Sequence, residues 1–188
     1  ADIDVSVDGV VASAFGFSGQ KCSACSRAIV EASVYEAFIE RLQERVGRLT
    51  VGDPAANPNL GPVINKAALD SMLGYIDTGR KDGRLVAGGN LVNSAGGGYF
   101  LEPTVIADVP PDAVISKEEI FGPVLAVIKV ESFEEGLKVV NNTEYGLTGA
   151  LYTADRERLN FARTEFHVGN LYFNRKCTGA MVGAHPFG

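Results

Sequence analysis

A cysteine lies in a glycine-containing bend near the start of the 188-residue chain, and a cysteine so placed can attack an electrophilic carbon. The stretch 17–27 reads Phe-Ser-Gly-Gln-Lys-Cys-Ser-Ala-Cys-Ser-Arg, with Cys22 at its centre. The thiolate is the reactive form of cysteine, and exposure on a bend beside a positive charge such as Lys21 favours that form. The sequence makes Cys22 a candidate nucleophile. The alternative is a small core residue, because free cysteine is often buried.

Cys22 and Cys25 also form a C-x-x-C pair, which raises the possibility of a redox or metal site. A redox pair of this kind is expected at the start of a helix. Here the next apolar residues, 28–30, have the pattern of a short buried strand. The sequence holds no second C-x-x-C to complete a zinc site, so we expect no metal, and Cys25 and Cys177 are interpreted as packing or pocket-wall thiols.

The elements that must position the bend alternate along the chain. Apolar spacing predicts a helix over 4–17, before the cysteine, and another over 34–49 that begins with a capping box, Ser33 and Glu36. Further helices are predicted from Asn65 to about residue 82, from Ser132 to 142, and from Asp155 to about 166. Predicted strands are 28–30, 84–87, 124–130, 150–152 and 170–173. Strands alternating with long helices predict an α/β fold, with an open, mostly parallel sheet covered by helices on both faces.

Composition limits the function classes. The net charge of −6 argues against a nucleic-acid partner. No apolar run approaches the roughly 18 residues of a membrane span, so we expect no membrane partner. Three cysteines, an odd number, suit reduced thiols, and together with the lack of a signal-peptide pattern at Ala1 they predict a cytoplasmic protein.

Several sequence blocks resemble those of one enzyme family. Gly19-Gln20-Lys21-Cys22 resembles the catalytic-cysteine motif of the aldehyde dehydrogenase superfamily, and its continuation to Arg27 resembles the 1-pyrroline-5-carboxylate (L-glutamate γ-semialdehyde) dehydrogenase branch. Further similar blocks lie at 51–54, 101–104, 118–124, 141–148 and 178–188. The resemblance covers the whole chain and implies the catalytic-domain fold of that family.

The resemblance implies a covalent mechanism with a nicotinamide cofactor, NAD or NADP. Cys22 is then the catalytic nucleophile: it forms a thiohemiacetal, and loss of hydride leaves a thioester that water hydrolyses. Glu119 is implied to bind the nicotinamide ribose hydroxyls, and Phe121 to pack near the nicotinamide ring. The alternative for Glu119 is a helix-start acceptor in a capping box with Ser116.

The same resemblance implies a site for the substrate carboxylate. Ser23 and the backbone N–H groups of Gly179 and Ala180 match the residues that hold it, and Ala180 can offer only its N–H. Phe187 matches an aromatic residue that lines the aldehyde pocket. Without the resemblance, 178–180 is an ordinary loop.

Family members are much longer than 188 residues. The resemblance therefore implies that 1–188 is the thiol-bearing catalytic domain alone, with the NAD-binding half, the general base and an oligomerisation segment outside it. The expected activity is oxidation of L-glutamate γ-semialdehyde to L-glutamate by a full-length homo-oligomer, in proline and arginine catabolism. The alternatives are another semialdehyde or aliphatic aldehyde as substrate, or an isolated domain that does not turn over.

Overall fold

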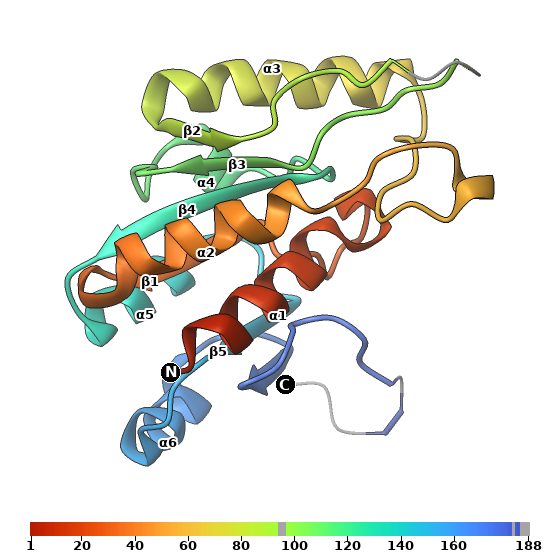
Figure 1. Ribbon diagram of the computed structural model, residues 1–188. Coiled ribbons are helices and arrows are strands. Elements are labelled where there is room, and N and C mark those ends of the chain that lie inside the picture. The colour runs from red at the N-terminus through yellow and green to blue at the C-terminus, as the bar shows by residue number, and fades with distance from the viewer. Residues whose placement is uncertain (94–96, 182, 185–188) are drawn as a thin grey trace.

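The computed structural model describes residues 1–93, 97–181 and 183–184, and its helices and strands alternate for most of the chain (Figure 1). The helices are α1 (Ile3–Phe15), α2 (Tyr35–Gly47), α3 (Lys66–Asp82), α4 (Val114–Lys117), α5 (Phe133–Asn141) and α6 (Arg156–Glu165). The strands are β1 (Arg27–Glu31), β2 (Arg84–Ala87), β3 (Thr104–Ala107), β4 (Val124–Val130), β5 (Thr148–Leu151) and β6 (Asn170–Phe173). Short 3₁₀ turns occupy Gly16–Gly19, Ala32–Val34 and Pro54–Ala56.

The main sheet has the strand order β1-β4-β3-β2. β1 and β3 both run parallel to β4, with Ile29 opposite Ile128, whereas β2 is antiparallel to β3. β5 and β6 form a separate parallel pair. This topology confirms the predicted open, mostly parallel α/β sheet, although the division into two sheets was not predicted.

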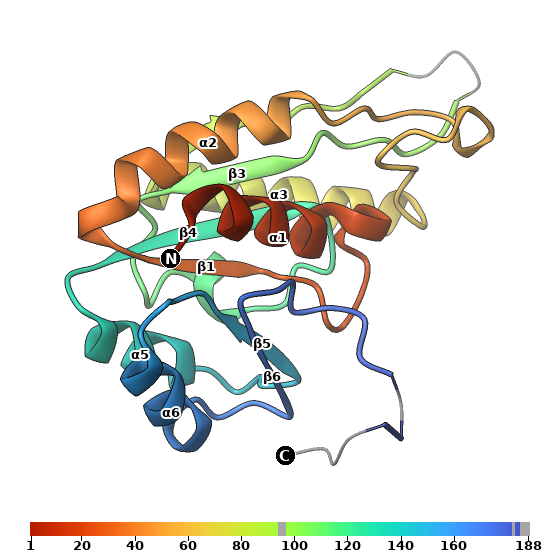
Figure 2. The ribbon, with the colours of Figure 1, turned by 60° about the horizontal axis from the view of Figure 1, so that its bottom comes forward.

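Helices cover both faces of the main sheet, as predicted. α1 and α2 lie side by side over one face and α3 lies over the other (Figures 1 and 2). β4 alternates between the two: Leu125 and Val127 pack in the cluster with α1 and α2, while Ala126 and Ile128 pack in the cluster with α3. Because both faces are covered, β4 is apolar and buried at nearly every position.

The β5–β6 pair has its own small core. Phe133 and Leu137 of α5 meet Ala162 of α6, with partly buried side chains of the two strands around them. Arg158 of α6 forms a salt bridge of 2.5 Å with Glu31 at the end of β1, which ties this unit to the edge of the main sheet.

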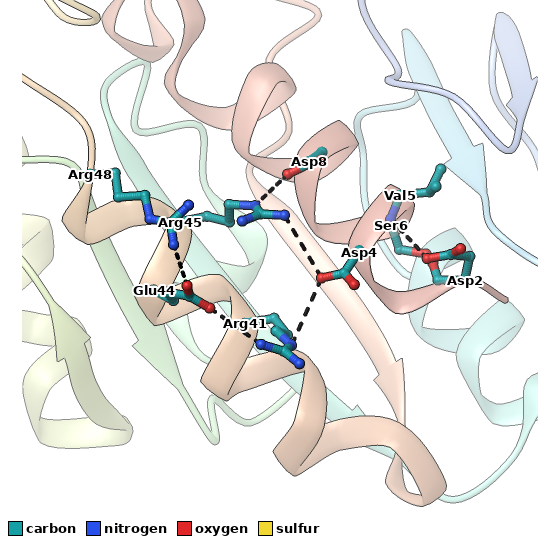
Figure 3. A network of polar contacts seen from close by, with 9 residues as sticks. All are labelled: Asp2, Asp4, Val5, Ser6, Asp8, Arg41, Glu44, Arg45 and Arg48. Carbon is teal, nitrogen blue, oxygen red and sulfur yellow. Dashed lines mark hydrogen bonds and ion pairs between the residues drawn. The ribbon is translucent and has the colours of Figure 1, made fainter.

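A network of charged side chains joins the outer surfaces of α1 and α2 (Figure 3). Arg45 donates to Asp8 at 2.7 Å and lies 3.8 Å from Asp4, which Arg41 also approaches at 3.8 Å. Asp8 and Asp4 are largely exposed, so the network orients two helices whose buried faces supply most of the attraction.

Three of the predicted helix starts are confirmed. The side chains of Asn65, Ser132 and Asp155 each accept a backbone hydrogen bond from the first turn of α3, α5 and α6. The capping box at Ser33 is wrong: residues Ala32–Val34 form a 3₁₀ turn, and α2 begins at Tyr35 with no side-chain cap.

Two strands differ from the prediction. β3 was missed, and it is a central strand of the main sheet. The strand predicted at 150–152 begins two residues earlier, as β5, because Thr148 already pairs with Asn170 of β6. Among the described residues, no helix combines the length and apolar character that crossing a bilayer requires.

Candidate active site

The bend that carries the cysteine begins where α1 stops. Phe17, Ser18 and Gly19 follow one another with φ angles of 60°, 54° and 66°, all left-handed. Such angles cost energy for residues with a side chain, and they persist where surrounding contacts enforce them. The chain therefore leaves the helix abruptly and turns toward β1.

Contacts on both sides of the bend enforce this conformation. Ser18 Oγ donates to the carbonyl of Gly61 at 3.0 Å. The Gln20 side chain accepts from the backbone N–H of Ile64 at 2.9 Å and donates to the carbonyl of Pro62 at 3.4 Å. The bend is thus fastened to the 61–64 loop by side chains that flank Gly19.

Gly19 lies against the backbone that follows α4. A Cβ atom at this position would come within 2.1 Å of the carbonyl oxygen of Gly122. Only glycine satisfies both the positive φ and this close approach. The contact sets the cysteine bend directly beside Phe121, which precedes Gly122.

Cys22 occupies the second position of a tight turn. The N–H of Ala24 donates to the carbonyl of Lys21 at 3.0 Å, which closes the turn and leaves Cys22 exposed. The N–H of Cys25 then donates to the carbonyl of Ser13 in α1 at 3.2 Å, just before β1 begins. Within the described part of the chain, the backbone N–H of Cys22 has no hydrogen-bond partner, so it can serve an incoming oxygen.

A cavity of about 570 Å³ lies against this turn. Cys22, Glu119 and Phe121 all line it, so the fold brings the candidate nucleophile and the two candidate cofactor residues to one space. Tyr145, which precedes β5, and Thr148, its first residue, line the same cavity.

Glu119 is not part of a helix. α4 ends at Lys117, and Ser116 Oγ donates to the carbonyl of Pro110 at 3.0 Å, so the capping-box alternative for Glu119 is wrong. The neighbouring Glu118 accepts a hydrogen bond from the Tyr75 hydroxyl at 2.6 Å. Among the described residues, the Glu119 carboxylate has no such partner, so its two oxygens are free to accept.

Phe121 is held with its ring partly in solvent. Its φ of 57° is left-handed, and 45% of the residue is exposed although its side chain is wholly apolar. Gly122 behind it is packed so closely that a Cβ atom would meet the Met72 sulfur at 2.5 Å. An exposed apolar ring on a strained, tightly packed backbone is typical of a ligand contact.

The segment 177–180 is attached beneath the turn. The carbonyl of Ser23 accepts from Thr148 Oγ1 at 3.4 Å and from the Cys177 thiol at 3.6 Å. Gly179, two residues beyond Cys177, has a φ of 86°, and both it and Ala180 are exposed. The fold therefore brings Ser23 close to the segment that carries the other two candidate substrate residues. Phe187 lies outside the described residues.

The model of the aldehyde dehydrogenase family matches residues 1–188, the whole chain. The chain belongs to the aldehyde dehydrogenase family.

Individual members of the aldehyde dehydrogenase family are closely similar to this chain. The chain is 52% identical to the 1-pyrroline-5-carboxylate dehydrogenase 1 of Halalkalibacterium halodurans, over 100% of the chain and 36% of that protein. It superimposes on the crystal structure of a Thermus 1-pyrroline-5-carboxylate dehydrogenase with bound NAD, with a TM-score of 0.96, 54% identity, and coverage of 100% of this chain and 36% of that one. The lactaldehyde dehydrogenase of Escherichia coli matches with a TM-score of 0.92 at 34% identity, over 99% of this chain and 39% of that one. The chain thus spans about a third of the length of the relatives it matches.

Some residues of this candidate site were not predicted as site residues. Ser13 and Tyr152 line the cavity, yet nothing in their local sequence marks them, and Gln20 lies in the motif before Cys22 but was given no role. Ser13 and Gln20 contact residues distant in sequence, so only the fold reveals what they do. Within the residues that the structure describes, no group of three or more His, Cys, Asp or Glu side chains could hold a metal.

Proposed function

We propose that this chain is the nucleophile-bearing part of an NAD-dependent dehydrogenase that oxidises L-glutamate γ-semialdehyde to L-glutamate, in proline and arginine catabolism. The observation that carries the proposal is the exposed Cys22, presented by an anchored bend into the cavity that Glu119 and Phe121 also line. The identity of 52% and 54% to 1-pyrroline-5-carboxylate dehydrogenases, over the whole chain, supports this choice of substrate.

The chemistry begins at Cys22. Its thiolate adds to the aldehyde carbon and forms a thiohemiacetal, and the unpartnered N–H of Cys22 is in position to stabilise the oxyanion. Loss of hydride leaves a thioester, which water hydrolyses to the acid and free Cys22. An aldehyde has no leaving group except hydride, so covalent capture supplies the orientation that hydride transfer needs.

The residues at the cavity fit a nicotinamide nucleotide. Glu119 offers two carboxylate oxygens to a pair of vicinal ribose hydroxyls, and the exposed Phe121 ring offers an apolar surface to a flat heterocycle. When bound, NAD supplies the hydride acceptor. The Thermus relative was crystallised with NAD, which favours NAD over NADP for this site.

Ser23, Gly179 and Ala180 would hold the substrate carboxylate. The Ser23 hydroxyl and the two backbone N–H groups are donors, and the positive φ of Gly179 opens the backbone toward an anion. Ala180 contributes no hydroxyl. We assign Phe187 to the wall of the same pocket on the family motif alone.

The chain matches about a third of its relatives, so the complete activity belongs to a longer protein. We assign 1–188 to the thiol-bearing catalytic domain, and we expect the NAD-binding half, the general base and an oligomerisation segment in the remainder. The full-length enzyme is then a cytoplasmic homo-oligomer, and the isolated chain forms no NADH.

Another aliphatic aldehyde is the second candidate substrate. The lactaldehyde dehydrogenase shares the fold at a TM-score of 0.92, so the scaffold alone does not select the substrate. Ser23 separates the candidates, because only a substrate with a carboxylate gains a charge-assisted hydrogen bond from its hydroxyl.

A chimera tests the proposal. This chain replaces the matching 36% of the Thermus enzyme, and NADH formation is measured with L-glutamate γ-semialdehyde and with hexanal. We expect turnover with the semialdehyde, and none after Cys22→Ala. We expect Ser23→Ala to raise KM for the semialdehyde about tenfold or more, as the loss of one hydrogen bond to a charge implies, and to leave KM for hexanal unchanged.

Other results would contradict parts of this proposal. A folded chimera that prefers hexanal, or in which Ser23→Ala changes both KM values equally, points to the second candidate. Turnover that survives Cys22→Ala removes Cys22 from the mechanism. NADH formation by the 188-residue chain alone contradicts the assignment of the cofactor-binding half to other sequence.

A further inference from the structure

A second pair of thiols lies beneath the nucleophile turn. Cys25 and Cys177 are far apart in the sequence, yet both backbones are bonded to Ser13 of α1. The N–H of Cys25 donates to the Ser13 carbonyl and the N–H of Cys177 donates to Ser13 Oγ, each at 3.2 Å. One residue of α1 therefore holds the two cysteines at a common place.

The two side chains are neighbours. The Cys25 thiol donates to the carbonyl of Arg27 at 3.4 Å and the Cys177 thiol donates to that of Ser23 at 3.6 Å, and each thiol lies near enough to change the pKa of the other. Both cysteines line the cavity that reaches Cys22, so a molecule the size of water has a route to them. The hydroxyl of Tyr152, near both thiols, has no hydrogen-bond partner among the described residues.

The surroundings make the two sulfurs chemically unequal. The neighbouring Cys25 thiol, with Ser13 and Thr148, lowers the pKa of Cys177 to about 6 against the opposing effect of burial. The neighbouring Cys177, together with burial, raises the pKa of Cys25. Of the two, Cys177 is therefore the sulfur that loses its proton more readily and attacks peroxide first.

We propose that Cys25 and Cys177 are a site of reversible oxidation by hydrogen peroxide, at which they form a disulfide independently of Cys22. The Cys177 sulfur attacks one peroxide oxygen, the O–O bond breaks, and the departing oxygen takes up a proton and leaves as water. The Cys25 sulfur then displaces the hydroxyl from the Cys177 sulfenic acid, forming the S–S bond and a second water. One peroxide is reduced and two thiols are oxidised.

The disulfide joins two parts of the proposed substrate site. Cys25 follows the turn that carries Cys22 and Ser23, and Cys177 precedes Gly179. Its formation consumes the thiol hydrogen that bonds Cys177 to the Ser23 carbonyl. This consequence for the substrate rests on the proposed function, whereas the disulfide itself does not.

Peptide mapping of the 188-residue chain tests the site without aldehyde or NAD. Trypsin cleaves after Lys21, Arg27 and Lys176, so one peptide holds Cys22 and Cys25 and another begins at Cys177. After peroxide treatment of the folded chain, we expect these two peptides to be joined and to separate on reduction with dithiothreitol. Thiol titration in denaturant should count three free thiols before oxidation and one afterwards, provided that no more than one equivalent of peroxide reacts.

Matched variants assign the bond. The cross-link should persist in Cys22→Ser and disappear in both Cys25→Ser and Cys177→Ser, and circular dichroism verifies that each variant folds. In urea-unfolded chain we expect the cross-link to form at least about tenfold more slowly, since the two thiols then meet only by loop closure.

Three outcomes would overturn the proposal. They are oxidation of Cys22 alone with the other two thiols free, a link between Cys22 and Cys25 inside one peptide, and equal cross-linking rates in folded and unfolded chain. None of them depends on whether the chain oxidises an aldehyde, so the proposed function stands or fails separately.

Discussion

At the scale of single residues, the position of the candidate nucleophile depends on neighbours that take no part in the proposed reaction. Gln20 lies two positions before Cys22 and bonds through both ends of its amide to the 61–64 loop. The bond to Ile64 is short, at 2.9 Å, and it satisfies a backbone N–H just before α3. Gln20 therefore acts as a positioning residue for the bend.

Replacing Gln20 by Ala should lower the free energy of unfolding. The variant loses two side-chain hydrogen bonds at a partly buried site, and we expect a loss of about 1–2 kcal/mol, measured by urea unfolding. Gln43 of α2 is the matched control, since it is exposed and makes no side-chain hydrogen bond among the described residues. Gln43→Ala should change the same quantity by less than about 0.5 kcal/mol. Equal effects of the two variants would contradict the positioning role.

The residues of the site differ in how well a sequence can predict them. Cys22 can be predicted from its motif and its bend, and in the structure it is exposed and lines the same cavity as Glu119 and Phe121. Ser13 is different, because its role comes from accepting bonds from Cys25 and Cys177, both distant in sequence. A local sequence pattern therefore predicts reactive side chains more readily than it predicts side chains that only hold others in place.

At the scale of elements, the end of β3 is where three segments meet. Asp108 follows β3 with a left-handed φ of 59°, its N–H donates to the hydroxyl of Tyr35 in α2, and its carboxylate accepts from Arg84 of β2. Partial burial opposes ionisation of Asp108, but the hydrogen bonds of Arg84 and Tyr35 outweigh it, so its pKa is lowered.

This lowered pKa predicts a pH-dependent effect of Asp108→Asn. A carboxyl group whose folded pKa is depressed stabilises the protein above its unfolded pKa, about 3.9, and loses that effect as pH falls through the folded value. Chemical unfolding should show wild type more stable than the variant at pH 7, with the gap closing below about pH 4. Asparagine tolerates the left-handed backbone, so strain does not confuse the result. Asp77→Asn, on the exposed face of α3, should show no comparable pH dependence.

A helix or strand could be predicted where its own residues determine where it begins and ends. The start of α3 follows from Asn65, whose side chain accepts from Ala68 at 2.8 Å. β3 was missed because Thr104–Ala107 is four residues long and follows Pro103, and its assignment depends on pairing with β4. Ser33 failed as a cap because the chain leaves β1 through a 3₁₀ turn, which leaves Ser33 inside the turn instead of before the helix.

At the scale of the whole molecule, the two sheets have unequal cores. β4 is enclosed by helices on both faces and by strands on both edges. β6 is only half-buried along its length, and among the described residues it pairs with β5 alone. Resistance to local opening should follow this difference.

Hydrogen exchange followed by mass spectrometry measures that difference. We expect the amides of β4 to exchange slowest and to match the free energy of global unfolding, while β5 and β6 open at lower cost. Equal protection of β4 and β6 would mean that the two sheets unfold together.

The pairing of β1 with β4 also bears on how the chain is made. About one hundred residues separate these partners, and the bend before β1 also rests on Gly122. At roughly 5–20 residues per second, a ribosome releases Cys22 several seconds before Gly122 and β4. While the residues in between are made, a nascent chain therefore carries Cys22 without the bend that presents it. The site comes into existence only once the strand at the centre of the sheet has emerged.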